Sequence, residues 1–161
     1  MFGAVGVSGK MALIPDKDQA TIRAHFDESL ENDVEIVMLT ERPSPIIILG
    51  KQTCETCEDT ESLLKEVVAL SDKLKLTVHD VGVSKDEAVK LGIDRVPAFV
   101  LNGASRGKVR FLGIPSGYEF SALIADVVDV SRGATDLSDE TRDYLATLTE
   151  DVNIKVFTTP T

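Results

Sequence analysis

The feature that most limits the folds open to this chain is a pair of cysteines, Cys54 and Cys57, set between an apolar run and a helix pattern. The run PIIIL, residues 45–49, is typical of a strand core. After the cysteines, apolar residues recur at helical spacing on one wide face: Leu63, Leu64, Val67, Val68 and Leu70. We therefore expect a strand followed by a C-x-x-C that opens a helix. Because the chain has only 2 cysteines, they act with each other or with a partner.

Periodic segments on both sides of the cysteines predict an α/β fold. An Asp16-x-x-Gln19 capping pattern begins a helix whose apolar stripe is Ile22, Phe26 and Leu30. The segments DVEIVMLT (33–40) and LKLTVHDV (74–81) predict strands. Between 33–40 and 45–49 the prolines of ERPSP break the chain, so these two runs form either a hairpin or one strand with an insertion over residues 41–48.

The second half of this pattern predicts a helix, a strand pair and a last helix. SKDEAVKLG (84–92) opens on a Ser84-x-x-Glu87 capping box and closes on Gly92. RVPAFVLNG and GKVRFLG predict two antiparallel strands that turn through Asn102 and Gly103 or just after them. A final helix extends from a Ser116-x-x-Glu119 box to Gly133. From the strand before the cysteines onward, the order is β-α-β-α-β-β-α.

Charge and hydropathy argue against two classes of partner. The formal net charge of −10 repels phosphate backbones and anionic lipids, which makes nucleic acid and membrane surfaces poor candidates. No apolar run approaches the roughly 20 residues of a spanning helix. Residues 1–15 lack the features of an export signal, and we interpret them as a flexible tail. A lone C-x-x-C without such a signal favours the reducing cytoplasm, where the pair would cycle.

The order of motifs resembles a known family. A strand, CETC at a helix start, then IDRVPAFV, VRFLGIPSGYEF and DVVDVSRG in sequence look like the first unit of the protein disulfide oxidoreductases, glutaredoxin-like proteins built from two thioredoxin-like units. The resemblance implies a thioredoxin-like fold, a central mixed sheet flanked by helices, over residues 16–133. It also implies that Cys54 is the nucleophile, that Cys57 is the resolving thiol and that Pro97 is a cis-proline beside them. The second C-x-x-C that such proteins carry is absent.

Disulfide exchange explains why two cysteines would stand at this spacing. Cys54 at the helix start lies near unpaired N–H groups and the positive end of the helix dipole, which stabilise a thiolate, and Cys57 is expected one turn in and shielded. The neighbouring carboxylates disfavour that thiolate: Glu55, Glu58, Asp59 and Glu61. Our hypothesis is therefore a reducing rather than an oxidising site.

The resemblance and the disulfide-exchange chemistry also lead to expectations about substrates and partners. Pro97 in the cis state would leave the Val96 backbone free to pair with a substrate strand, so both are expected substrate-binding residues; alternatively, Pro97 simply begins a strand. The site needs no cofactor beyond the cysteine pair and no metal. Expected partners are proteins with disulfides or thiols. They include a thioredoxin-reductase-like flavoprotein as electron donor, or a peroxiredoxin. Lys51 could also bind a carboxylate of glutathione.

Zinc binding and a non-catalytic adaptor role are the alternatives to disulfide exchange. C-x-x-C supplies two zinc ligands, but His25 and His79 lack the spacing of a zinc site. The other rival is a non-catalytic thioredoxin-like adaptor that binds redox partners and uses the bridge only for stability. A bridge that closes so short a loop removes little unfolded-state entropy, which makes stability a weak reason for it.

The end of the chain repeats the plan of its beginning. A capped helix with the stripe Thr141, Tyr144, Leu145 and Leu148 precedes a D-V-x-I segment at 151–154, as the first helix precedes D-V-x-I at 33–36. We therefore expect residues 134–161 to be the first helix and strand of a second, truncated thioredoxin-like unit. The strand expected over 152–157 would pair with the sheet or with another chain.

Overall fold

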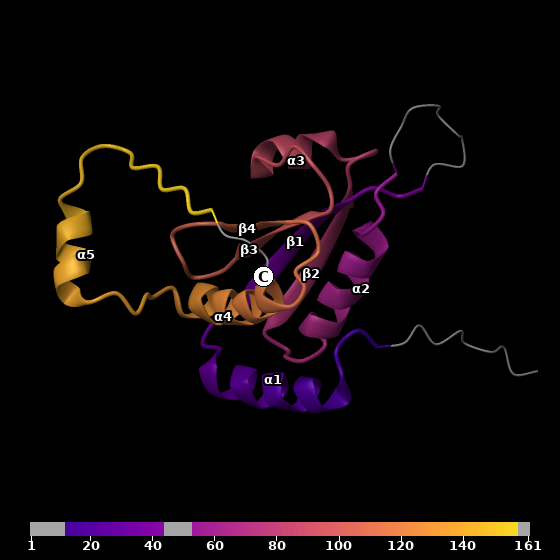
Figure 1. The fold of residues 1–161 in the computed structure, drawn as a ribbon, viewed down its shortest axis with the longest axis horizontal. Coiled ribbons are helices and arrows are strands. Elements are labelled where there is room, and N and C mark those ends of the chain that lie inside the picture. The colour runs from indigo at the N-terminus through magenta and orange to yellow at the C-terminus, as the bar shows by residue number, and fades with distance from the viewer. Residues whose placement is uncertain (1–11, 44–52, 158–161) are drawn as a thin grey trace, which may run out of the picture.

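The structure, a computed structural model, describes residues 12–43 and 53–157, and its described strands form one mixed sheet (Figure 1). The strand order is β2-β1-β3-β4. β1 pairs in parallel with β2 and antiparallel with β3, and β3 pairs antiparallel with β4. The strands are β1 (Val34–Thr40), β2 (Leu74–Asp80), β3 (Ala98–Asn102) and β4 (Val109–Leu112).

β1 is a central strand because its sequence is apolar on both faces. Every residue of β1 except Glu35 is buried, as expected of a strand covered by helices on both sides. Alternate residues divide between two cores: Ile36 and Met38 face one, Val37 and Leu39 the other. The apolar run 45–49 lies wholly outside the described residues. The expected insertion 41–48 lies outside them from residue 44 on.

Helices cover both faces of the sheet. The larger core lies between the sheet and the apolar sides of α1 (Asp16–Ser29), α2 (Cys57–Val68) and α4 (Tyr118–Arg132). On the other face α3 (Lys85–Leu91) packs on a smaller core. In the larger core, Phe99 and Phe111 stack with ring centroids 4.8 Å apart. The predicted order of elements and the antiparallel pair β3 and β4 are confirmed.

Helix ends differ in detail from the predicted capping boxes. Gly92 and Gly133 end α3 and α4 at φ of 66° and 65°, the left-handed conformation that glycine adopts at least cost. The capping prediction for α1 is wrong, because Pro15 is the cap and the Gln19 amide donates instead to the Ile14 carbonyl. For α4 the cap is Gly117 rather than a serine. At α3, Ser84 is the cap but its side chain makes no capping bond.

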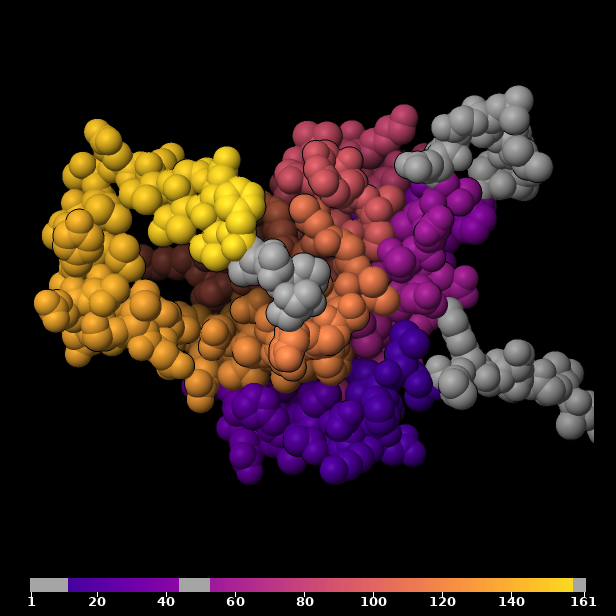
Figure 2. All heavy atoms as spheres, in the orientation of Figure 1, coloured from indigo at the N-terminus to yellow at the C-terminus, as the bar shows by residue number. Residues whose placement is uncertain are grey.

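The predicted last helix forms, whereas the predicted last strand does not. α5 (Asp139–Ala146) has a side-chain cap from Ser138, yet all residues from 132 to 157 are exposed. Figures 1 and 2 show α5 standing away from the sheet and its helices, and the segment after it running back toward them. Residues 151–157 form no strand, which corrects the expectation of pairing over 152–157. The physical reason is that a strand needs a neighbour for its N–H and C=O groups, and this segment has none among the described residues.

None of the helices in the described part of the chain combines the length and the apolar character needed to cross a membrane.

Candidate functional site

The two cysteines lie where the chain enters α2, at the end of β1. Cys54 and Cys57 form a disulfide with their Cα atoms 5.5 Å apart. Cys57 is the first residue of α2 and Cys54 precedes the helix. The expectation that Cys57 lies one turn inside the helix is therefore wrong; both sulfurs stand at the helix N-terminus, where unpaired N–H groups and the helix dipole favour negative charge.

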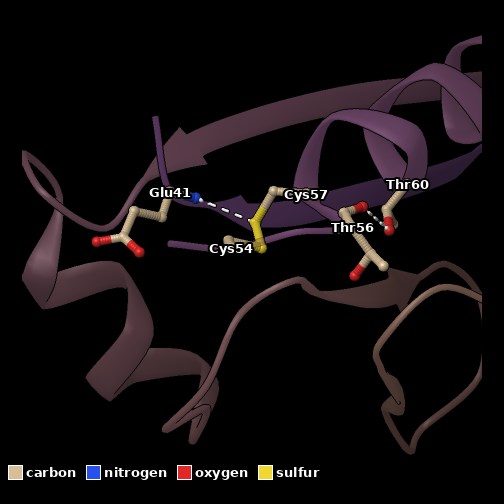
Figure 3. Close-up of a disulfide and its surroundings, with 5 residues drawn as sticks. All are labelled: Glu41, Cys54, Thr56, Cys57 and Thr60. Carbon is tan, nitrogen blue, oxygen red and sulfur yellow. Dashed lines mark hydrogen bonds between the residues drawn. A yellow bond between two sulfur atoms is a disulfide. The ribbon is translucent and has the colours of Figure 1, made fainter. Parts of the chain in front are cut away.

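The two sulfurs differ in access to solvent. Cys54 is partly exposed, whereas Cys57 is buried at 3% exposure. The backbone N–H of Glu41, just beyond β1, donates to Cys57 Sγ at 3.4 Å (Figure 3). Cys54 is therefore the more accessible of the two cysteines. The segment that follows β1 contacts Cys57 through the N–H group of Glu41.

A cleft of about 310 Å³ opens beside the disulfide, between the end of β1 and the first turns of α2. Its walls carry charges of both signs rather than a continuous apolar surface. The lining residues are Thr40, Glu41, Arg42, Pro43, Cys54, Glu55, Cys57, Glu58, Glu61, Ser62 and Lys65.

Glu61 differs from the other carboxylates near the cysteines because it is buried, at 6% exposure. Its Oε1 lies 2.7 Å from Lys65 Nζ, and its Oε2 lies 2.9 Å from Arg42 Nη2. Burial raises the pKa of Glu61, but the hydrogen bonds and charges of Lys65 and Arg42 outweigh burial, so the pKa is lowered from its ordinary value. Glu61 is thus a paired, ionised group.

This pairing corrects one element of the charge argument made from sequence. Glu55, Glu58 and Asp59 are exposed at the start of α2. Glu61 was counted with them as a charge that opposes the thiolate, yet two cations compensate it. The Lys65 partner was readable from the i,i+4 spacing, whereas Arg42 is 19 positions away along the chain and required the fold.

Val96 and Pro97 lie on the approach to β3, beside β1. The peptide bond between them is cis. Val96 is partly buried and Pro97 is buried. The β1–β3 register ends on the pair Leu39 and Ala98, so Val96 and Pro97 precede β3 at the end of the sheet where β1 leads to Glu41, whose N–H contacts Cys57. The fold thus brings the predicted substrate-binding residues to the same end of the sheet as the cysteines.

Neither histidine lies in an element that carries a cysteine. His25 is in α1, where its Nδ1 lies 3.4 Å from Ser29 Oγ, and His79 is in β2. Over residues 12–43 and 53–157, no three His, Cys, Asp or Glu side chains come together in a way that could hold a metal ion.

A four-stranded mixed sheet with helices on both faces, and a disulfide C-x-x-C at the start of α2, is the fold of the thioredoxin-like disulfide oxidoreductases. Residues 45–125 match the family model described as thioredoxin domain, and the chain belongs to this family. A curated relative, a probable thioredoxin of Methanothermobacter thermautotrophicus, is 29% identical over 85 residues, which cover 52% of this chain and 95% of the relative.

Solved structures extend the similarity beyond the family match. A protein disulfide oxidoreductase of Aeropyrum pernix superposes with a TM-score of 0.68 at 27% identity, covering 84% of this chain and 55% of the other. The alkylhydroperoxide reductase AhpF of Enterococcus faecalis superposes with a TM-score of 0.68 at 21% identity, over 83% of this chain and 60% of the other, which shows the fold alone. This chain therefore matches little more than half the length of these two proteins.

Proposed function

We propose that the protein is a thiol–disulfide oxidoreductase that reduces disulfides in protein substrates through Cys54 and Cys57. The observation that carries the proposal is the asymmetric pair at the α2 N-terminus, with one sulfur accessible and the other buried at 3% exposure. In the first step the Cys54 thiolate attacks one sulfur of the substrate disulfide. A Cys54–substrate bond forms, the substrate S–S bond breaks, and the second substrate sulfur leaves as a thiolate that takes up a proton.

In the second step Cys57 loses its proton to water and attacks Cys54 Sγ of the mixed disulfide. The Cys54–Cys57 bond forms and the substrate sulfur leaves as a thiolate, so the substrate gains two electrons and the protein loses two. Val96, just before β3 at the same end of the sheet as the cysteines, offers backbone groups to an extended substrate segment, and Pro97 shapes this approach.

We further propose that the pair works in the reducing direction and in the cytoplasm. The exposed carboxylates Glu55, Glu58 and Asp59 disfavour a stabilised thiolate, which supports a reducing site. A new cycle needs a dithiol donor, and the relationship to thioredoxins supports a thioredoxin-reductase-like flavoprotein. Peroxiredoxins are proposed among the acceptors. Glutathione is the competing donor, and coupled assays with each donor alone distinguish them.

Insulin reduction tests the proposed activity. With dithiothreitol as donor, the protein should accelerate precipitation of the insulin B chain, and Cys54→Ser should abolish the acceleration. An exposed serine outside the site, Ser121→Ala, is a matched control that should retain it. If the intact, folded protein gives no acceleration, the oxidoreductase proposal fails and the non-catalytic adaptor remains.

We also propose that residues 134–161 begin a second thioredoxin-like unit, after the first unit over 16–133. Support comes from the amphipathic α5, whose Tyr144 and Leu145 side chains are 67% and 46% exposed. In α1, which has the same place in the repeated plan, Ile22 and Phe26 are buried against the sheet. α5 would bury its stripe in the same way against a second sheet.

A further inference from the structure

We propose that Glu61 is a positioning residue for the resolving thiol: through Arg42 it holds the segment after β1 so that the Glu41 N–H stays directed at Cys57 Sγ. The inference rests on the proposed function, in which Cys57 resolves the mixed disulfide. Glu61 itself is not assigned contact with substrate. Glu61 acts through Arg42 and through Glu41, the residue that precedes Arg42 in the sequence.

The geometry forms a short chain of contacts across the cleft. Cys57 and Glu61 are one helical turn apart on the buried side of α2. Glu61 Oε2 lies 2.9 Å from Arg42 Nη2, and the N–H of Glu41, the residue before Arg42, donates to Cys57 Sγ at 3.4 Å. The ion pair and the N–H···S bond thus connect the same two-residue segment to two points on α2. One of these two points is Cys57 Sγ, the sulfur that must be ionised to resolve the mixed disulfide.

Burial explains why this carboxylate can act as an anchor. The Glu61 side chain is 8% exposed, whereas Arg42 is 54% exposed. A buried carboxylate is costly unless paired, so Glu61 retains Arg42 and Lys65 as partners. Lys65 belongs to α2 itself and cannot restrain the β1 segment, whereas Arg42 links the two elements. The lowered pKa of Glu61 keeps the anchor charged at neutral pH.

The expected effect on Cys57 has a definite sign. A backbone N–H donated to sulfur stabilises the thiolate more than the thiol, so holding it in place lowers the pKa of Cys57. Glu61 acting only as a nearby negative charge would raise that pKa. Removing Glu61 therefore raises the pKa of Cys57 if it positions, and lowers it if only its charge matters. The other charged groups that line this cleft from the β1 segment and α2 are Glu41, Arg42, Glu55, Glu58 and Lys65.

The test is a titration of Cys57 as the only thiol, in the Cys54→Ser background, by ultraviolet absorbance of the thiolate. Glu61→Leu, which keeps the buried volume but has no oxygen that could contact Arg42, should raise the pKa of Cys57 by about one unit. Glu61→Gln keeps an oxygen that can contact Arg42 but removes the charge, so the pKa of Cys57 should not exceed that of the parent. A rise with Leu and none with Gln is a pattern that simple loss of charge cannot produce.

A control and a second measurement separate positioning from damage to the fold. Asp33→Leu removes a surface carboxylate paired with Lys75 at the opposite end of β1, and should leave the Cys57 titration unchanged. With Cys54 restored, Glu61→Leu should resolve a preformed mixed disulfide about threefold more slowly at neutral pH. A higher pKa lowers the fraction of Cys57 that is thiolate, and this loss is larger than the gain in nucleophilicity of each thiolate. Circular dichroism establishes that each variant is folded. If Leu fails to fold, Glu61→Met, which also lacks an oxygen that could contact Arg42, takes its place in the same test.

Two outcomes overturn the inference. One is a fall, or no change, in the pKa of Cys57 in folded Glu61→Leu; the other is an equal rise in Gln and Leu. The titration requires no turnover and no substrate. Absence of insulin reduction alongside the expected titration would therefore defeat the proposed function alone, and normal insulin reduction with an unchanged titration would defeat the positioning role alone.

Discussion

The chemical difference between Cys54 and Cys57 comes from burial. Both stand at the α2 N-terminus, yet one is partly exposed and the other 3% exposed. In the reduced protein, Cys54 should therefore react first with limiting iodoacetamide, as shown by peptide mapping. After denaturation in urea the two should label equally, which controls for intrinsic reactivity. Preferential labelling of Cys57 in the folded protein would reverse the assigned roles.

The resolving role that we propose for Cys57 leads to a second expectation for a single residue. Cys57→Ser removes the group that releases the substrate, so mixed disulfides through Cys54 should accumulate in cell extract. Non-reducing electrophoresis and mass spectrometry would identify the trapped proteins. The double variant Cys54→Ser, Cys57→Ser is the matched control and should trap none. If the single and double variants recover the same proteins, Cys54 does not form the intermediate.

At the scale of elements, the Arg42–Glu61 ion pair connects the end of β1 to α2, and its contribution to stability should depend on pH. Burial raises the pKa of Glu61, but Lys65 and Arg42 lower it further, to below its ordinary 4.5. A carboxyl with a lowered folded-state pKa stabilises the fold above the unfolded value, and this stabilisation is lost as pH falls through the folded value. The free energy of unfolding of the wild type relative to Glu61→Gln should therefore decline on acidification below about 4.5, as urea titrations would measure.

Asp126 in α4 gives a control of opposite sign. Burial, with a smaller effect of Asp129, raises the pKa of Asp126 above its ordinary 3.8. Its contribution is therefore most favourable below the unfolded value and diminishes as pH rises through the folded value. Relative to Asp126→Asn, the wild type should gain stability on acidification. The same slope for both pairs of proteins would show that the Glu61 network is not the cause.

At the scale of the whole molecule, the exposed C-terminal part bears on how many units the protein has. α5 and the segment after it carry exposed apolar side chains that the described sheet does not cover: Tyr144, Leu145, Leu148, Val152, Ile154, Val156 and Phe157. If residues 134–161 open a second unit, the protein isolated from its native source should have an intact mass clearly above the 17.4 kDa of this chain. A native mass near that value would refute the second unit.

Much of the fold was predictable from local pattern. Periods of two and 3.6 located the strands and helices, and Gly92 and Gly133 marked two helix ends, because these signals depend on neighbours within a few residues. The same locality misled at the end of the chain. Residues 151–157 alternate like a strand but have no partner among the described residues, and pairing is not a local property.

The sequence by itself determined the chemistry available to this protein: two cysteines at C-x-x-C spacing before an amphipathic helix, in an acidic chain. Only the tertiary structure decided which groups surround them. It buried Cys57 and brought the Glu41 N–H to its sulfur, and it paired Glu61 with Arg42. These contacts join β1 to α2, and their partners depend on how sheet and helix pack. A carboxylate that looks solvated by its spacing becomes an anchor because the fold removes it from water and supplies a cation.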